Sequence, residues 1–273
     1  MSIEIVFQRG EITLKGKIHL AQGNGPFTTI ILLHGLPGNE IDVLGLGQKL
    51  SDKGINVLTF NYSGTYKSDG LFSFANSQLD IQAAYTFLHQ NEQIKRFKID
   101  TSRFYIGGYS DGGGMALSYA VNHREINAVF SIAGTDHGEF MREYSKDKNL
   151  KNIVDNIFEK MKEQENVIRF APNSTPKEIM EQNIDISPYD QRLNSKALAS
   201  KQLLLIGGWD DSQVTIDNYI LPLYRKLLEE NANKITIRAF QDGHSFDNTR
   251  NELMHAILEW INSIEHVSKI SHK

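Results

Sequence analysis

Residues 103–117 read Arg-Phe-Tyr-Ile-Gly-Gly-Tyr-Ser-Asp-Gly-Gly-Gly-Met-Ala-Leu and pass from an apolar, β-rich run into a helix-like run. Between the two runs lies Gly108-Tyr-Ser-Asp-Gly112, so that Ser110 occupies a tight turn between a predicted strand and a predicted helix. This is the context of a nucleophile elbow, which holds a serine hydroxyl above a sheet and aims helical N–H groups at a forming negative charge. Glycines suit the turn because Cβ atoms beside the serine would collide with the neighbouring strand and helix.

The G-x-S-x-G pattern has limited specificity when it stands alone. In a chain of this composition it is expected by chance in about one sequence in ten. The alternative role for Ser110 is that of a helix-capping serine. The hypothesis of a nucleophile therefore needs partner residues elsewhere in the chain.

The overall composition is that of an ordinary globular protein with one domain, or with one domain and an insertion. The chain has 273 residues, of which 40% are hydrophobic and 23% charged, and its net charge is −4. This charge gives no reason to expect nucleic acid or an anionic membrane as a partner. The lack of cysteine excludes disulfides, thiolate catalysis and Cys-based zinc sites. We recognise no signal peptide and no transmembrane span, and therefore expect a cytoplasmic protein.

Short apolar runs alternate with helix-like segments along most of the chain. Besides the strand before Ser110, strands are predicted at 3–7, 12–20, 28–33, 55–60, 128–133, 201–206 and 235–240. Strands that alternate with helices at this spacing indicate βαβ units. Continuous apolar runs are typical of strands that are buried on both faces. The sequence therefore predicts the α/β class, with a mostly parallel central sheet flanked by helices.

The alternation of strands and helices stops between Thr135 and Ala199. Apolar residues at helical spacing predict an amphipathic helix over 150–161, and a short helix is predicted at 177–182. Such a long segment between two strands indicates an insertion, although a crossover helix with long loops is the alternative. We expect residues 1–134 and 200–273 to form the core, and 135–199 to form a helical cap or lid.

Polar clusters follow the predicted strands at their carboxyl ends. These clusters are His34–Gly38, Asn61–Gly70, Ser110, Asp210–Asp211 and His244. In an open parallel sheet the carboxyl ends of the strands meet at one edge, where ligands bind. Residues far apart in the chain are therefore expected to converge there.

A serine hydroxyl needs a base within hydrogen-bond reach, and the base needs a carboxylate to fix its tautomer. His244 follows the last strand and is the candidate base, with a surface-loop histidine as the alternative. Asp211 follows the preceding strand and is the candidate acid. Asp210, its neighbour, and Asp136, after an earlier strand, are the competing acids.

With these motifs in place, the chain resembles the α/β-hydrolase superfamily over nearly its whole length. The matching pieces are His34-Gly-Leu-Pro-Gly38, Gly108-Tyr-Ser-Asp-Gly112, Gly208-Trp-Asp-Asp-Ser-Gln-Val214 and Gly243-His244. The chain order Ser110, Asp211, His244 is that of the superfamily. The segment Gly243-His-Ser-Phe, with Arg250 nearby, is similar to prolyl-oligopeptidase-type catalytic domains and related small carboxylesterases.

The resemblance implies a serine hydrolase that uses neither a metal nor an organic cofactor. Its oxyanion hole would consist of the backbone N–H groups of Leu36 and Asp111. His34 is expected to support the oxyanion loop, and His137 to lie at the hinge of the cap. The expected substrate is a small-molecule ester, and a short peptide is the alternative. Only about thirty residues precede the oxyanion loop, so the N-terminal propeller of the long peptidases is missing, which favours an esterase. A non-catalytic binding protein is the hypothesis from a different class.

Overall fold

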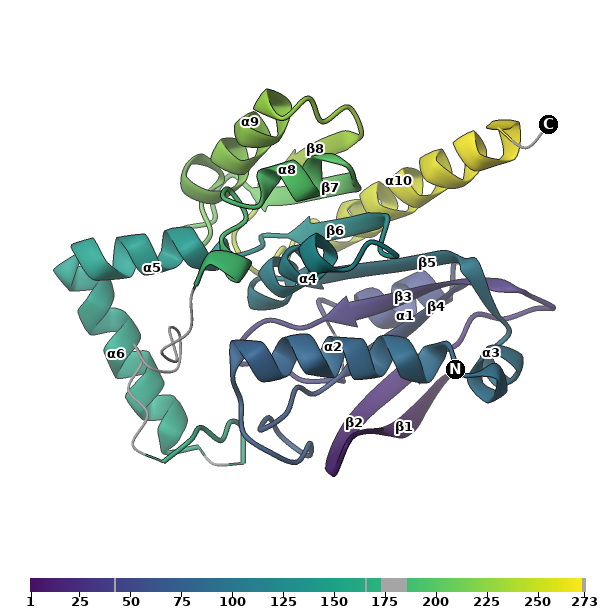
Figure 1. The fold of residues 1–273 in the computed structure, drawn as a ribbon, viewed down its shortest axis with the longest axis horizontal. Coiled ribbons are helices and arrows are strands. Elements are labelled where there is room, and N and C mark those ends of the chain that lie inside the picture. The colour runs from purple at the N-terminus through teal and green to yellow at the C-terminus, as the bar shows by residue number, and fades with distance from the viewer. Residues whose placement is uncertain (42, 165, 173–185, 272–273) are drawn as a thin grey trace.

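The computed structural model describes residues 1–41, 43–164, 166–172 and 186–271, with 267–271 described by their backbone only. Its centre is an eight-stranded sheet with the order β1-β2-β4-β3-β5-β6-β7-β8 (Figure 1). The strands are β1 (Ser2–Arg9), β2 (Ile12–His19), β3 (Phe27–Leu33), β4 (Ile55–Phe60), β5 (Ile99–Tyr109), β6 (Ala128–Ile132), β7 (Gln202–Gly208) and β8 (Ile235–Phe240). Strands β3 to β8 are mutually parallel, whereas β2 pairs antiparallel with both β1 and β4. The predicted α/β class with a mostly parallel sheet is confirmed.

The burial pattern of each strand agrees with its position in the sheet. All six residues of β4 are buried, as are six of the seven residues in both β3 and β7. Such continuously buried strands suit the centre of a sheet that is covered on both faces. The edge strand β1 instead alternates, with Ile5 and Phe7 turned into the core and their neighbours more exposed.

Helices cover both faces of this sheet (Figure 1). On one face, α4 (Asp111–Asn122) lies between α2 (Phe74–Leu88) and α8 (Ser195–Ala199), and α8 contacts α9 (Leu221–Glu229). On the other face, α1 (Leu46–Ser51) packs against α10 (Arg250–Ser271). Two further short elements are α3 (Asn91–Phe97) before β5 and η2 (Ile216–Ile220) before α9. None of the described helices combines the length and the apolar character that a membrane-spanning segment requires.

The chain leaves the sheet between β6 and β7. Helices α5 (His137–Lys146) and α6 (Lys148–Lys162) project to one side of the sheet, and η1 (Ser187–Tyr189) leads back to α8 (Figure 1). Helix α6 contains the predicted amphipathic helix over 150–161, whereas α5 is not predicted by the apolar pattern. The helix predicted at 177–182 lies outside the described residues. A distinct cap unit over 135–199 stays a prediction.

The segment after α6 returns to the core by pairing with the loop after β4. The Arg169 N–H donates to the Gly64 carbonyl (2.7 Å), and the Phe72 N–H donates to the Arg169 carbonyl (2.7 Å). The Tyr66 N–H donates to the Val167 carbonyl (3.0 Å). The far end of the α5–α6 pair is thus anchored to the loop that follows β4.

Candidate active site

The register of the parallel strands collects the predicted site residues at one edge of the sheet. Leu33 of β3 pairs with Gly108 of β5, and Tyr109 pairs with Ile132 of β6. The residues that follow these strands therefore emerge side by side at the carboxyl edge, as expected for a ligand-binding edge.

Ser110 occupies the turn between β5 and α4 in a strained backbone conformation. Its φ is 56° and its ψ is −123°, which a residue other than glycine adopts at a cost of about 1–3 kcal/mol. Surrounding hydrogen bonds hold it there. The Ser110 N–H donates to the Ile132 carbonyl (2.9 Å), and the Ser110 carbonyl accepts from the N–H groups of Gly113 (3.0 Å) and Thr135 (3.1 Å).

Two glycines allow the elbow to pack closely against the loop after β3. A Cβ atom on Gly112 would lie 2.5 Å from the carbonyl oxygen of His34, which is rigid backbone. A Cβ atom on Gly35 would lie 2.9 Å from the Ser110 Cβ. Contacts this short do not occur in relaxed proteins, so both positions require glycine.

Ser110, His244 and Asp211 form a hydrogen-bonded relay. The Ser110 Oγ lies 3.0 Å from the His244 Nε2, and the His244 Nδ1 lies 2.7 Å from the Asp211 Oδ2. The side chain of His244 is 12% exposed and that of Asp211 is fully buried. This arrangement lets the Ser110 hydroxyl donate to a neutral imidazole whose other nitrogen donates to a carboxylate.

The backbone after β7 fixes the Asp211 carboxylate. Its Oδ1 accepts hydrogen bonds from the N–H groups of Gln213 (2.8 Å) and Val214 (2.9 Å), which leaves Oδ2 for His244. The competing carboxylates lie elsewhere. Asp210 is exposed and accepts from the Gln241 side chain (2.9 and 2.8 Å). Asp136 caps α5 by accepting from the N–H groups of Gly138 and Glu139.

The turn after β8 positions the imidazole of His244. Asp242 Oδ2 accepts from the N–H groups of Asn248 and Thr249 (both 2.9 Å), which ties the turn to the start of α10. Burial raises the pKa of Asp242, but these bonds outweigh it and leave the pKa below its usual value. The ring of Tyr109 packs against His244 with centroids 5.1 Å apart, and burial raises the pKa of Tyr109 to about 12.

Two backbone N–H groups beside Ser110 are unused by the protein. Among the described residues, neither the Leu36 N–H nor the Asp111 N–H donates to another protein group. Asp111 directly follows Ser110, and Gly35, which precedes Leu36, lies against the serine. An oxyanion hole made of these two N–H groups stays a prediction.

His34 supports the loop that carries Leu36. Its buried ring donates from Nδ1 to the Gly35 carbonyl (2.8 Å), and the Tyr62 hydroxyl donates to the His34 carbonyl (3.2 Å). Burial lowers the pKa of His34, which favours the neutral ring. In the same region the predicted polar cluster at 61–70 supplies a supporting contact, because Asn61 Oδ1 accepts from the Glu40 N–H (2.9 Å).

His137 and Asp111 form a buried hydrogen-bonded pair beside the serine that the sequence did not predict. The Nε2 of His137, the first residue of α5, donates to Asp111 Oδ1 over 2.8 Å, and both residues are buried. Sequence reasoning used only the backbone of Asp111 and assigned His137 to a hinge. Both residues follow neighbouring strands, β5 and β6, so the strand-end rule that selected Ser110 applies to them too.

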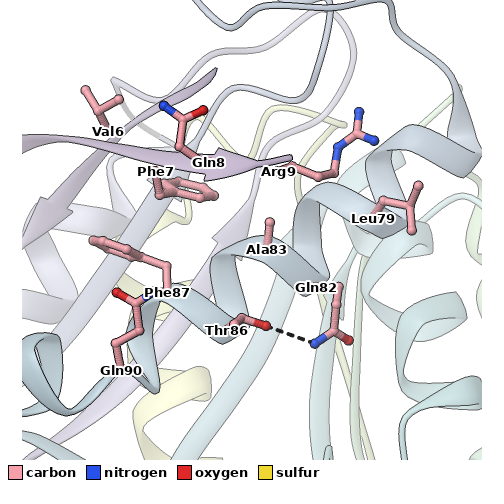
Figure 2. A pocket seen from close by; sticks show the side chains of 10 residues that line it. All are labelled: Val6, Phe7, Gln8, Arg9, Leu79, Gln82, Ala83, Thr86, Phe87 and Gln90. Atoms are coloured by element: carbon pink, nitrogen blue, oxygen red, sulfur yellow. Dashed lines mark hydrogen bonds between the residues drawn. The ribbon is translucent and has the colours of Figure 1, made fainter. Parts of the chain in front are cut away.

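The described residues form no candidate metal site, but they do form a groove away from the relay. Among the described residues, no group of three or more His, Asp or Glu side chains could hold a metal ion. A groove of about 510 Å³ runs between β1 and α2, with Phe7 and Phe87 stacked at 5.3 Å in its wall (Figure 2). None of the residues that line this groove belongs to the relay.

Comparison with a protein-family model matches residues 28–247 to the family described as alpha/beta hydrolase fold. The solved structure of Est1E from Butyrivibrio proteoclasticus with bound ferulic acid superposes with a TM-score of 0.66 at 14% identity. The superposition covers 95% of this chain and 98% of Est1E. At this identity the likeness shows the fold alone.

Curated relatives match a shorter part of the chain. A proline iminopeptidase of Saccharolobus solfataricus is 26% identical over 115 residues, which are 42% of this chain and 35% of that protein. Cutinase 2 of Thermobifida cellulosilytica is 25% identical over 118 residues, which are 43% of each protein. The chain thus matches well under half of the length of these relatives.

Proposed function

This chain belongs to the α/β-hydrolase fold family, and from that premise we propose that it is a serine hydrolase that cleaves carboxylic esters through an acyl-enzyme. The observation that carries the proposal is the relay from Ser110 Oγ to His244 Nε2 at 3.0 Å and from His244 Nδ1 to Asp211 Oδ2 at 2.7 Å. Its order along the chain and its place at the strand ends fit the family.

In the proposed reaction Ser110 Oγ attacks the ester carbonyl carbon while His244 Nε2 takes the hydroxyl proton. Asp211 holds the ring in the required tautomer and stabilises the imidazolium. His244 then protonates the leaving alkoxide as the carbonyl reforms, which leaves the acyl group on Ser110. A water molecule, deprotonated by His244, cleaves this ester in the second half of the cycle.

The tetrahedral oxyanion is the species that the site must stabilise most. We assign this role to the N–H groups of Leu36 and Asp111, which make no other hydrogen bond within the described residues. Donors of this kind contribute about 3–4 kcal/mol each in the transition state. The start of α4 adds the positive end of its dipole.

The names of the similar proteins support an ester as the first choice of substrate and an amide as the second. A cutinase is among the matched relatives, and a structure with bound ferulic acid shares the fold. A proline iminopeptidase is also among the relatives, so hydrolysis of a short peptide by the same three residues is the alternative. We assign the choice between acyl groups to a cap formed by residues 135–199.

A non-catalytic binding protein on the same fold is the rival hypothesis. Such proteins usually lose a member of the relay, whereas all three residues are present here and within hydrogen-bond distance. Catalysis at Ser110 therefore separates the two hypotheses.

Pre-steady-state hydrolysis of p-nitrophenyl butyrate tests the proposal. The protein should release a burst of about one equivalent of p-nitrophenol followed by a slower steady rate, because an activated p-nitrophenyl ester acylates the serine faster than water removes the acyl group. The Ser110→Ala variant should show no burst and at least a thousandfold lower kcat. An unchanged rate in this variant would refute the proposal.

A further inference from the structure

Asp111 places a carboxylate beside the nucleophile, and the proposed reaction uses only its backbone N–H. The residue is 8% exposed, and its Oδ1 accepts from His137 Nε2 over 2.8 Å. His137 is itself 2% exposed and packs against the ring of Phe74 with centroids 4.5 Å apart. A buried carboxylate is unfavourable unless its oxygens are hydrogen-bonded, so this placement calls for a function.

One of the two carboxylate oxygens of Asp111 accepts no hydrogen bond from the described residues. Asp111 Oδ2 is buried, yet no described residue donates a hydrogen bond to it. His137 Nδ1, on the far side of the pair, has no hydrogen-bond partner in the described part of the chain either. Buried polar atoms in native proteins rarely lack a partner, and those that do are candidates for catalytic or ligand-binding roles.

Covalent geometry keeps this carboxylate close to the reacting atoms. An N–Cα bond of about 1.46 Å and an N–H···O distance of about 2.9 Å place the Asp111 Cα within roughly 4.4 Å of an oxyanion held by its own N–H. The carboxylate extends from this Cα, so its negative charge opposes the charge that develops on the nearby oxyanion. A positive group on the acyl part of the substrate would remove this repulsion and would donate to Oδ2.

His137 gives the carboxylate a fixed orientation. It holds Oδ1 from the first turn of α5, and its ring is enclosed by Phe74 and, at 6.5 Å between centroids, by Tyr189. The Asp111 carboxylate therefore has one oxygen that accepts from His137 and one that has no donor among the described residues. It lies on the first residue of α4, immediately after Ser110.

We propose that Asp111 recognises a protonated amine on the acyl group of the substrate, with His137 as the positioning residue. This inference rests on the proposed function, because it takes Ser110 as the nucleophile and the Asp111 N–H as an oxyanion donor. It narrows the substrate class to esters or amides whose acyl group carries an ammonium close to the scissile carbonyl. An ammonium is preferred to a neutral donor because charge-assisted hydrogen bonds are about twice as strong.

Three p-nitrophenyl esters of similar size test the assignment: 2-aminobutyrate, 2-methylbutyrate and 2-hydroxybutyrate. Each kcat/KM is divided by the spontaneous hydrolysis rate of the same ester, which removes the intrinsic reactivity of the amino ester. The wild-type protein should favour the amino ester over the methyl ester at least tenfold. In Asp111→Asn this amino-to-methyl ratio should fall at least tenfold.

Two further variants separate a loss of amine recognition from a general loss of folding or activity. His137→Gln should also lower the amino-to-methyl ratio, because it releases the carboxylate but leaves the reacting residues in place. Asp247→Asn removes an exposed carboxylate that pairs with Arg250, and it should leave the ratio unchanged. The methyl ester serves as an internal measure of folding in each variant.

The inference is overturned by an amino-to-methyl ratio that is the same in Asp111→Asn and in wild type. It is also overturned by a wild-type preference for the methyl ester, or by equal preference for the hydroxy ester and the amino ester. Hydrolysis of the methyl ester that depends on Ser110, without preference for the amine, would refute this inference alone. Failure to hydrolyse any of the three esters, with Ser110 unacylated, would refute the proposed function itself.

Discussion

At the scale of single residues, the proposed chemistry depends on how little freedom the three relay side chains retain. Strained backbone at Ser110 points the hydroxyl out of the elbow. Two N–H groups hold one oxygen of Asp211, so that the other meets His244 at 2.7 Å. Pre-organisation of this kind lowers the entropic cost of aligning the three groups during the reaction.

Replacement of Asp211 by Asn should lower kcat/KM for p-nitrophenyl butyrate by about 10³–10⁴-fold, because the amide favours the wrong tautomer of His244. Asp210→Asn is the matched control, since Asp210 is adjacent and exposed, and its side chain is hydrogen-bonded only to Gln241 among the described residues. It should stay within about threefold of wild type. Equal losses in the two variants would contradict the assignment of the acid.

Gly35→Ala should reduce kcat by about 10–100-fold, because the added Cβ would lie 2.9 Å from the Ser110 Cβ and displace the nucleophile. The melting temperature should fall as well, by the equivalent of about 1–3 kcal/mol. In Gly243→Ala, next to the base, the new Cβ has no neighbour closer than 3.9 Å. That variant should keep most of its activity, and a comparable loss in both would argue against the steric explanation.

At the scale of elements, the strands deliver the site residues and the turns after them fix their orientation. The turn between β8 and α10 is an example, because the Asp242 carboxylate accepts from Asn248, Thr249 and Gly243. His244 lies inside this turn, so its position depends on a side chain that takes no part in the reaction.

Asp242→Asn should lower the free energy of unfolding at pH 7 by about 1–3 kcal/mol, because N–H groups that now meet a carboxylate would meet a weaker acceptor. The folded state holds the pKa of Asp242 below its usual value. Its contribution is therefore complete above the unfolded pKa, about 3.9, and disappears as the pH falls through the lower folded pKa. Urea titrations at pH 7 and pH 3 should show a difference between variant and wild type that shrinks at pH 3. A constant difference would contradict this account.

At the scale of the whole molecule, ion pairs join the start of α5 to the segment between η1 and α8. Arg142 of α5 bonds to Asp190, which is 1% exposed, and Arg192 lies 3.5 Å from the buried Asp136. Burial, and next the charge of Asp190, raise the pKa of Asp136. The two arginines thus compensate two buried carboxylates at the base of α5.

Arg142→Gln should destabilise the protein by about 3 kcal/mol, because it leaves Asp190 buried without its cation. Hydrogen exchange should also quicken in α5. Lys226→Gln is the control, since Lys226 pairs with Glu229 at the surface, and exposed pairs contribute less than about 1 kcal/mol. Similar stabilities for the two variants would show that the buried pair does not anchor α5.

The sequence predicts the sheet and the relay because both leave local patterns. β3 contains the continuous apolar run Ile30–Leu33, and Ser110 lies between glycines at a strand end. Helix α5 has no such pattern, since Met141 and Tyr144 are its only buried large apolar side chains among the described residues. The Asp111–His137 contact joins residues 26 positions apart, and only the parallel pairing of β5 with β6 brings them together.

Covalent labelling with a serine-directed reagent determines whether Ser110 is the nucleophile. The intact protein is treated with a fluorophosphonate, digested and analysed by mass spectrometry. We expect one phosphonyl adduct per chain, located on Ser110, and at least a hundredfold slower labelling in His244→Ala. An adduct on another residue, or no adduct on Ser110, would contradict the assignment of the nucleophile.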